Sequence, residues 1–512
     1  MIKKFSILNF SRFAFANRGS SIARQSGQFS VRQRGQLSII VLIFSSLAII
    51  ILSGLIIWVD SGQKAAYRSA NQKLALMIAE AGIEYSRWHL AHAPNDFQDG
   101  TGQPGPYTHN YYDKDGGLSG QFILEITPPP INSSLVTIKS TGKVNGISDV
   151  EKIIQAQLGI PSVVKYAVLA NSNIRFEPGT NVYGPIHANG GIHFDGVAYN
   201  YVTSARTTYN DPDHSGIDEY GVHTHTLPVD PEPPASPLSV RPDVFVAGRE
   251  FPVPSVDFAG LTQTLAKIKS DAQSGGRYLG PSGEKGYHIV LKTNDTFDVY
   301  KVKKMMKKPD KTCEDTLKQK NWKTWSIKTA GSGNEQFIAN YAFPANGLVF
   351  AEDHVWVDGQ INTAKITIAS GKFPYNPKTF TNIIIDKNLT YTNYDGQDVV
   401  GLIAQGNINV GMNSDDNLRI DAAVVAQNGN VWRYYYRPPS GGKVYCSPYH
   451  NRQSITLNGM IATNSGYGFA YTDGSGYQNR TIIYDSNLLY NPPPSFPFTS
   501  DYYQQISWKE IK

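Results

Sequence analysis

The sequence predicts a mainly β protein with one long N-terminal helix. Three observations lead to this fold class: a single apolar run near the N-terminus, a helix-forming segment directly after it, and many short strands separated by Gly and Asn turns. We expect a transmembrane and stem helix, then a small antiparallel sheet, then an irregular parallel β-helix. A pair of β-sandwiches is the alternative for the last part.

The apolar run covers residues 35–59 and contains no charged side chain. A helix needs roughly 20 apolar residues to cross a bilayer, so this run is long enough to span one. A cleaved signal peptide is a weaker alternative, because its apolar core is shorter, about 7–15 residues, and ends at small residues. A buried core helix is weaker still, since no other segment of the chain is comparably apolar.

Charge predicts the orientation of this helix. The basic leader, residues 1–35, carries seven Lys and Arg and no acidic residue, whereas the segment after Asp60 is mixed. The positive-inside rule then places the N-terminus in the cytoplasm and the bulk of the chain outside, in the periplasm or at the cell exterior. The leader also accounts for the net charge of +5. The basic balance therefore concerns topology and predicts no nucleic-acid partner.

The helix is expected to continue past the membrane, over residues 36–92. Good helix formers dominate after Asp60, and Pro94 marks a stop. A membrane anchor followed by a separate juxtamembrane helix is the alternative. The apolar residues that recur at three- and four-residue steps are Ala66, Ala70, Leu74, Met77, Ala81 and Tyr85.

Residues 30–92 resemble the N-terminal region of type IV pilins, in particular PilX-type minor pilins. The junction Arg34-Gly35-Gln36 ends a basic leader, and residues 79–82 read AEAG. The resemblance implies that a prepilin peptidase cleaves after Gly35, that the new N-terminus at Gln36 is methylated, and that other pilin subunits are partners. Major pilins usually have Phe where this chain has Gln36 and Glu where it has Ile40. These departures point to a minor or accessory subunit.

The first part outside the membrane, residues 93–160, is expected to form a small pilin-like β unit. Residues 95–120 read as a loop rich in Gly, Pro, Asp and Tyr. Three alternating segments after it, QFILEIT, SLVTIKSTGKV and VEKIIQAQLGI, predict about three antiparallel strands.

Residues 161–512 are expected to form the β-helix-like outer domain. Strands of three to six residues are too short to be stable singly, but stacked coils share one core. The β-sandwich alternative stays open, because the Asn-Gly pairs at 189–190 and 428–429 are also typical of β-hairpin turns. The apolar residues expected to point inward are Ile384, Leu402, Ile408, Leu418, Ile420, Val424 and Leu457.

The β pattern is interrupted over residues 201–343, which predicts a loop-rich insertion. The Lys-rich segment 301–323 is expected to be a solvated protrusion. The Pro- and aromatic-rich C-terminus is expected to fold back over the last coil and cover its open edge.

Two cysteines offer one tentative disulfide. Cys313 and Cys446 both lie outside the membrane in this topology, where the space is oxidising. Two free thiols are the alternative, and the chain has no CxxC motif for metal or redox chemistry.

One polar cluster offers weak metal candidates. Residues 209–226 contain Asp211, Asp213, His223 and His225, and the His-x-His spacing puts two imidazoles on one side of a strand. A solvated loop is the favoured interpretation, so no metal and no cofactor are predicted. The neighbouring His187 and His193 are interpreted as packing or surface residues.

The sequence predicts a structural or adhesive surface protein and no enzyme. No nucleophile elbow, phosphate loop or zinc-protease motif is present, and the carboxylates stand in turn contexts. Aromatic residues around 432–436 are a plausible surface for carbohydrate, or else core or inter-subunit contacts. The alternatives are a membrane-tethered carbohydrate-active enzyme on a β-helix and an anchored surface protein unrelated to pili.

Overall fold

The computed structural model describes residues 34–129, 133–160, 162, 164–212, 214, 216–235, 238–258, 264–496 and 502–511. It divides the chain into two compact units, Met1–Lys73 and Leu74–Lys512, which we describe separately.

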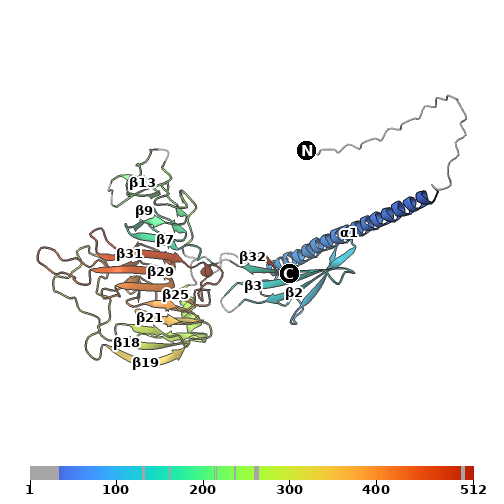
Figure 1. Cartoon of the computed structure of the whole chain (residues 1–512). Helices are drawn as coiled ribbons and strands as arrows, with labels where there is room; N and C mark the ends of the chain where they lie inside the picture. The colour runs from blue at the N-terminus through green and yellow to red at the C-terminus, as the bar shows by residue number, and fades with distance from the viewer. Residues whose placement is uncertain are drawn as a thin grey trace. The chain divides into compact units, whose positions relative to one another are not determined.

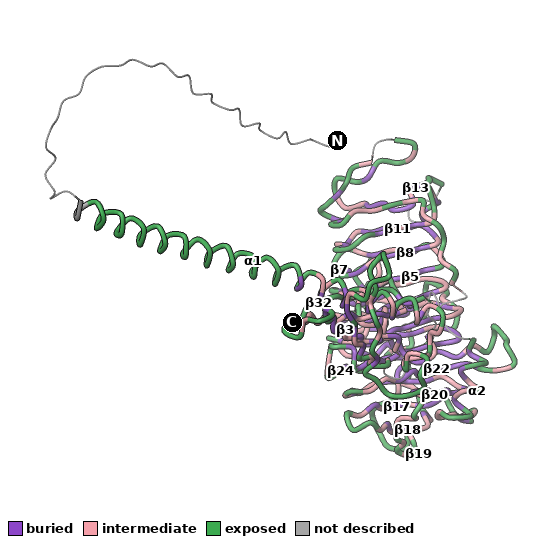
Figure 2. Tube along the Cα trace, turned by 90° about the vertical axis from the view of Figure 1, so that its right-hand side faces the viewer, coloured by how far each residue is buried: buried purple, intermediate pink, exposed green. Residues whose placement is uncertain are grey.

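One helix begins the described chain. Helix α1 runs unbroken from Arg34 to His92, 59 residues, so the anchor and the stem are one continuous helix (Figure 1). Its apolar residues 37–59 are all exposed, as Figure 2 shows in green. The alternative of two separate helices does not hold.

The stem part of α1 packs on a small antiparallel sheet. Five strands lie in the order β1-β2-β3-β4-β32. Their bounds are β1 Tyr107–Tyr112, β2 Leu118–Thr127, β3 Val136–Val144, β4 Glu151–Gly159 and β32 Gln504–Glu510. Buried helix residues such as Ala75, Ile78 and Ile83 share one core with Leu124 and Ile138 of the sheet. The predicted apolar stripe is not the buried face: Met77 is exposed, and Leu74 and Tyr85 are only partly buried at the edge of this core.

Two strands of this sheet differ from the sequence-based expectation. Strand β1 lies in the region expected to be a loop. Strand β32 comes from the C-terminus, which was expected to cover the last coil of the outer domain, and instead pairs antiparallel with β4. The β-helix is therefore inserted between the fourth and fifth strands of the small sheet.

The outer domain is a parallel β-helix, and the sandwich alternative does not hold. Most of its strands pair in parallel within one large sheet, while β6, β9 and β14 form a separate parallel sheet and β12–β13 an antiparallel hairpin. The first group of strands is β5 Val168–Ala170, β6 Ile174–Phe176, β7 Thr180–Tyr183, β8 Ile186–Ala188, β9 Ile192–Phe194, β10 Val197–Ala198, β11 Val202–Ser204, β12 Thr208–Asn210, β13 Asp218–Tyr220, β14 Val222–His223 and β15 Arg249–Glu250. The second group is β16 Arg277–Leu279, β17 Tyr287–Leu291, β18 Thr296–Val302, β19 Glu335–Ala342, β20 Leu348–Ala351, β21 Val355–Ile361, β22 Lys365–Ser370, β23 Ile383–Ile384, β24 Leu389–Tyr391, β25 Val399–Ala404, β26 Ile408–Val410, β27 Asn417–Ala426, β28 Val431–Arg433, β29 Asn451–Thr463, β30 Tyr467–Gly468 and β31 Gly476–Tyr484. The described helices of this domain are α2 Leu265–Gly275 and the 3₁₀ turn η2 Ser486–Leu489.

The coils do not stack in simple chain order. The chain starts in the middle of the stack at β5, and successive coils β8, β11 and β15 continue toward one end (Figure 2 labels the first three). It then crosses to the other end, where β16 begins a second series through β20, β22, β25, β27 and β29. The last coil finally pairs with the first, with Ile461 opposite Val168 and Ile482 opposite Val182.

The corners of the coils are built by stacked asparagines. Asn407 accepts the backbone N–H of Asn430 at 2.8 Å, and its own N–H donates to Asn382 at 2.9 Å. A Cβ at Gly429 would lie 2.1 Å from the Asn407 side chain, so the glycine is required by the neighbouring coil. The Asn-Gly pairs therefore form coil corners and not hairpins.

Apolar residues fill the inside of the β-helix and also a strip on its outside. Six of the seven residues expected inward belong to the inner core; Ile384 does not and packs outside against Trp325 and Trp356. A second outer strip, which includes Phe350, Ile403 and Val425, is covered by Leu265 and Ile268 of α2. The segment that crosses between the two ends is thus held by apolar burial.

We expect Gly142→Ala to destabilise the packing of the stem helix on the small sheet. A Cβ at Gly142 would lie 2.0 Å from the backbone oxygen of Ala75, so the helix must shift. Overpacking of this kind costs about 1–3 kcal/mol, although alanine normally suits a strand better than glycine. Hydrogen exchange of the 74–92 amides, measured on the detergent-solubilised chain, should rise.

The matched control is Gly468→Ala, where an added Cβ meets no heavy atom within 4 Å. It should leave exchange in the 74–92 segment unchanged. Equal exchange in both variants and the parent would contradict the close contact.

Candidate functional site

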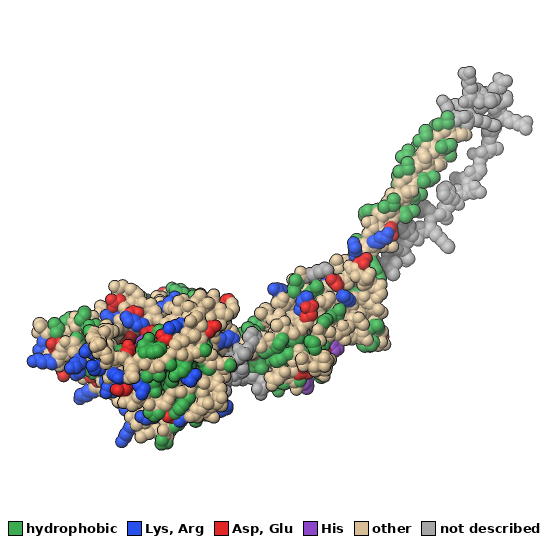
Figure 3. All heavy atoms as spheres, turned by 90° about the horizontal axis from the view of Figure 1, so that it is seen from below, with side chains coloured by type: hydrophobic (Ala, Val, Ile, Leu, Met, Phe, Trp, Pro, Cys, Tyr) green, Lys and Arg blue, Asp and Glu red, His purple; other side chains and the backbone are tan. Residues whose placement is uncertain are grey.

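The apolar part of α1 is the first functional surface. From Leu37, the helix is long and apolar enough to cross a membrane, and its most apolar part is entirely unburied. Figure 3 shows hydrophobic side chains along this part of the helix. Such a surface is stable only in lipid or against other apolar helices. The described helix thus fits a single-pass membrane anchor.

A buried histidine cluster lies near one end of the β-helix. In β9, Ile192 and Phe194 belong to the inner core, so the alternation of the strand turns His193 outward. His223 of β14 is its direct neighbour in register on the next coil. The hairpin β12–β13 contributes Glu219, and Asp211 directly follows its first strand. His193, His223, Asp211 and Glu219 are each at most 3% exposed.

Hydrogen bonds tie these side chains into one network. Asp211 Oδ2 lies 2.8 Å from His193 Nδ1 and 3.2 Å from His223 Nε2. His193 Nε2 lies 2.8 Å from Asp195 Oδ2, whose other oxygen accepts the His225 backbone N–H at 2.8 Å. Glu219 Oε1 lies 2.9 Å from His214 Nδ1 and 3.4 Å from His225 Nε2.

The electrostatics of the cluster favour ionised carboxylates. Burial raises the pKa of Asp195, but hydrogen bonding and charge attraction from His193 lower it to about 2 overall. Burial also raises the pKa of Asp211, but hydrogen bonds and charge attraction from His193 and His223 lower it well below the usual range overall. Burial lowers the pKa of His193, and the carboxylates of Asp195 and Asp211 raise it above the ordinary value. Burial and the neighbouring histidines lower the pKa of His225.

The structure brings together three of the four weak metal candidates. Asp211, His223 and His225 lie in one group, and Asp213 lies outside the described residues. His193, interpreted from sequence as a packing or surface residue, completes the group. No local sequence signal indicates this, because His193 joins the group only through the parallel register between β9 and β14, which places it beside His223.

The two cysteines form a disulfide inside a second buried cluster. Cys313 and Cys446 are joined across 133 residues and pack with Trp325, Tyr434 and Tyr436. The Lys-rich segment around Cys313 was expected to be a solvated protrusion, but it covers apolar side chains on the outside of the coils. Tyr434 and Tyr436 are fully buried, so these two are core contacts and not an exposed aromatic surface.

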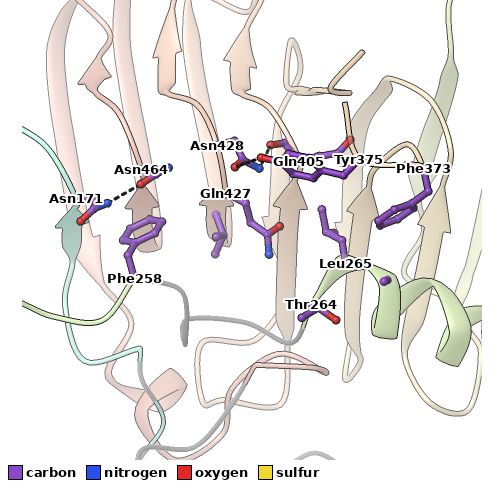
Figure 4. A pocket seen from close by; sticks show the side chains of 12 residues that line it. Asn171, Phe258, Thr264, Leu265, Phe373, Tyr375, Gln405, Gln427, Asn428 and Asn464 are labelled. Carbon is purple, nitrogen blue, oxygen red and sulfur yellow. Dashed lines mark hydrogen bonds between the residues drawn. The ribbon is translucent and has the colours of Figure 1, made fainter. Parts of the chain in front are cut away.

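A groove of about 450 Å³ lies on the outer face of the β-helix (Figure 4). Its lining joins amide side chains at the coil corners with aromatic rings. Asn171 donates to Asn464 at 2.7 Å, and the Tyr375 hydroxyl donates to Asn428 at 3.1 Å. The residues that Figure 4 labels are Asn171, Phe258, Thr264, Leu265, Phe373, Tyr375, Gln405, Gln427, Asn428 and Asn464. Such a surface can accept hydroxyl groups and stack on flat apolar faces.

The turn aspartates serve local structure. Asp398 accepts the backbone N–H groups of Thr392 at 2.9 Å and Asn393 at 2.6 Å. Asp421 accepts from the Tyr391 backbone at 3.0 Å and pairs with Arg419 at 2.9 Å. Asp398 therefore satisfies a turn, as expected for Asp in such positions, whereas Asp421 lies within strand β27 and contacts the neighbouring coil.

No protein-family model matches the chain, and no curated protein matches it. Among solved structures, it is similar to the competence-associated pilin ComZ from Thermus thermophilus, with 12% identity over 86% of this chain and 97% of that chain. The TM-score is 0.32, which is too low to carry an inference about the fold or function of this chain.

A further histidine, His288 of β17, is held between two carboxylates. Its Nδ1 lies 2.7 Å from Glu335 and its Nε2 lies 3.0 Å from Asp358. Burial lowers the pKa of His288, but the two carboxylates raise it to about 9 overall. The unfolded value is about 6.5, so the protonated ring stabilises the fold fully below pH 6.5.

We expect the stability of the outer domain to fall as the pH rises from 6.5 through 9. The loss from His288 is on the order of 3 kcal/mol at most, since each pKa unit corresponds to about 1.4 kcal/mol. His288→Gln should remove this part of the pH dependence. Urea unfolding of the detergent-solubilised chain between pH 6 and 9.5 measures it.

His187→Gln is the control, because burial lowers the pKa of His187 from its ordinary value, the opposite direction to His288. An unchanged slope in His288→Gln would show that the two carboxylates do not hold a proton on this ring.

Proposed function

We propose that this chain is an envelope-anchored, pilin-like surface protein that acts as a minor or accessory subunit of a type IV pilus. Its role is structural or adhesive and not enzymatic. The N-terminus lies in the cytoplasm, and the outer domain is presented outside the membrane.

The observation that carries this proposal is the division of α1 into two environments. Residues 37–59 expose apolar side chains on all sides, while residues such as Ala75, Ile78 and Ile83 are buried against an antiparallel sheet. In a soluble protein, the exposed apolar residues 37–59 would contact water. A protein that is only anchored in the membrane would not need a helix that continues into a packed domain. A helix with both parts suits a subunit that moves from a membrane into a bundle of like helices.

The start of the helix supports an accessory role. Major pilins usually have Glu at the position of Ile40, and a Glu side chain in lipid needs an ionic partner. In this chain, no acidic residue occurs between residues 1 and 59. The helix can therefore enter an apolar bundle without a charged partner, as a subunit at a terminus or a special position would.

The first test is the N-terminus of the protein isolated from membranes or sheared surface material. Processing by a prepilin peptidase predicts a mature chain that begins at Gln36 and carries a methyl group. Gly35→Val should retain the complete leader, because the peptidase needs the small residue. Mass spectrometry of the intact protein distinguishes the two forms.

The control is Gly62→Val on the same helix, where an added side chain meets open space. It should be processed like the parent chain. A parent chain that keeps Met1 would make the segment a plain membrane anchor and would overturn the pilin assignment.

The adhesive part of the proposal rests on the amide- and aromatic-lined groove, which suits a surface carbohydrate. Tyr375 is 61% exposed at this groove and offers a ring face for stacking. Tyr375→Ala should weaken binding to a glycan array roughly 2- to 10-fold, as the loss of one stacking contact does. Tyr112→Ala on strand β1, at a similarly exposed tyrosine, should not. Equal binding by both variants would remove the groove from the proposal.

A further inference from the structure

The histidine cluster is more than a solvated loop. Three imidazoles and one carboxylate, from His193, His223, His225 and Asp211, offer ligand atoms that all lie within 4.8 Å of one another. His193 and His223 are at most 1% exposed, so these two rings are removed from water, whereas His225 is partly exposed. Burying this many ionisable groups is costly unless they are paired or share a cation.

The second nitrogen of each buried ring is already held by an acceptor. His193 directs Nδ1 to Asp211, and its Nε2–H donates to Asp195. His223 directs Nε2 to Asp211, and its Nδ1–H donates to the backbone oxygen of Tyr220 at 3.3 Å. Metal-bound histidines have a similar arrangement, in which an acceptor on the outer nitrogen fixes the orientation of the ring while the inner nitrogen faces the metal.

We propose that His193, Asp211, His223 and His225 form a binding site for a zinc-type divalent transition-metal ion. Imidazole and carboxylate ligands in a four-coordinate arrangement suit Zn²⁺, whereas Ca²⁺ and Mg²⁺ prefer oxygen ligands alone. Ligands of a tetrahedral zinc site lie roughly 3.3 Å apart, as metal–ligand bonds of about 2.0 Å imply. The contact of Asp211 with His223, at 3.2 Å, fits this spacing, and its contact with His193, at 2.8 Å, would lengthen by about 0.5 Å on metal binding.

A buried oxygen without a hydrogen-bond partner points to the same site. Glu219 is 2% exposed, its Oε1 contacts His214 and His225, and its Oε2 has no hydrogen-bond partner among the described residues. An ion bound to His225 supplies a positive charge beside this carboxylate. Without such an ion, this buried carboxylate oxygen loses hydration with no hydrogen bond from the described residues to offset the cost.

The ion would attach the hairpin β12–β13 to the outer face of the coils. His193 and His223 belong to successive coils, His225 follows β14, and Asp211 belongs to the hairpin segment. With four protein ligands the site is closed, which is typical of structural and not catalytic zinc. Its function is therefore to fix the hairpin over one end of the β-helix, where the strand edge of β14 would otherwise be uncovered.

The test uses the full-length chain in detergent, stripped of metal with a chelator and then titrated. We expect about one Zn²⁺ per chain by mass spectrometry of the dialysed protein. Co²⁺ should give the intense visible absorption of a four-coordinate site. Zn²⁺ should raise the unfolding temperature, and Ca²⁺ and Mg²⁺ should not. Binding should weaken in acid, because the imidazoles must lose their protons.

Substitutions separate ligands from supporting residues. His223→Gln and Asp211→Asn should abolish the Co²⁺ absorption, and Asp195→Asn should weaken Zn²⁺ affinity about 10- to 100-fold, as loss of an outer-shell partner does. The control is His187→Gln, a histidine equally buried on the neighbouring strand β8 but bonded to Thr203 and Asn189. It should bind Zn²⁺ like the parent.

Absence of stoichiometric Zn²⁺ and of a four-coordinate Co²⁺ spectrum in the parent chain would overturn the proposal, and so would equal loss in His187→Gln. If the ligand variants fail to fold, the spectrum and the Zn²⁺-dependent thermal shift of the parent chain decide by themselves. Failure of this test leaves the pilin proposal untouched, since that depends on processing at Gly35.

Discussion

The pairing of the last coil with the first coil is the constraint on which the outer domain depends. Strand β29 lies against β5, and β31 lies against β7, although the paired residues are about 300 positions apart in the chain. Without this seam, the upper coils and the lower coils would be two short stacks with open ends. With it, they share one inner core, which extends from Phe245 through Val168 and Ile461 to Ile289.

The seam also explains how the β-helix can be an insertion in a small sheet. Because the last coil stacks on the first, the chain leaves the β-helix close to where it entered. Ser162, before the first coil, donates to the backbone oxygen of Leu488, after the last one, at 3.0 Å. Strand β32 can then return to β4 and complete the five-stranded sheet that packs on the stem. Insertions are tolerated where the two ends lie close together.

The sequence predicted the parts of the fold that depend on local composition. The apolar run, the stem periodicity and the short strands led to α1, the small sheet and a parallel β-helix. It could not predict the coil order, because nothing local to Val168 indicates pairing with Ile461. The same limit explains β32, which reads as an isolated alternating segment until its partner is known.

The candidate site shows the same division between local and long-range information. The spacing of His223 and His225 predicted two imidazoles on one side of a strand. The membership of His193 depended on the register of another coil, and the burial of the cluster depended on the hairpin that covers it. The prediction of a solvated Lys-rich protrusion was wrong for a related reason. The segment around Cys313 is polar overall, but Trp325 and the disulfide pack it against Tyr436.

The disulfide bears on topology independently of the leader. Cys313 and Cys446 are fully buried and joined, and disulfides form and persist in oxidising compartments, not in the cytosol. The disulfide therefore supports the proposal that the outer domain lies on the side of the membrane opposite the cytoplasm. The basic leader, through an unrelated physical rule, argues for a cytoplasmic N-terminus. A helix that crosses the membrane once satisfies both requirements, and the exposed apolar surface from Leu37 to Val59 is the segment of α1 that can do so.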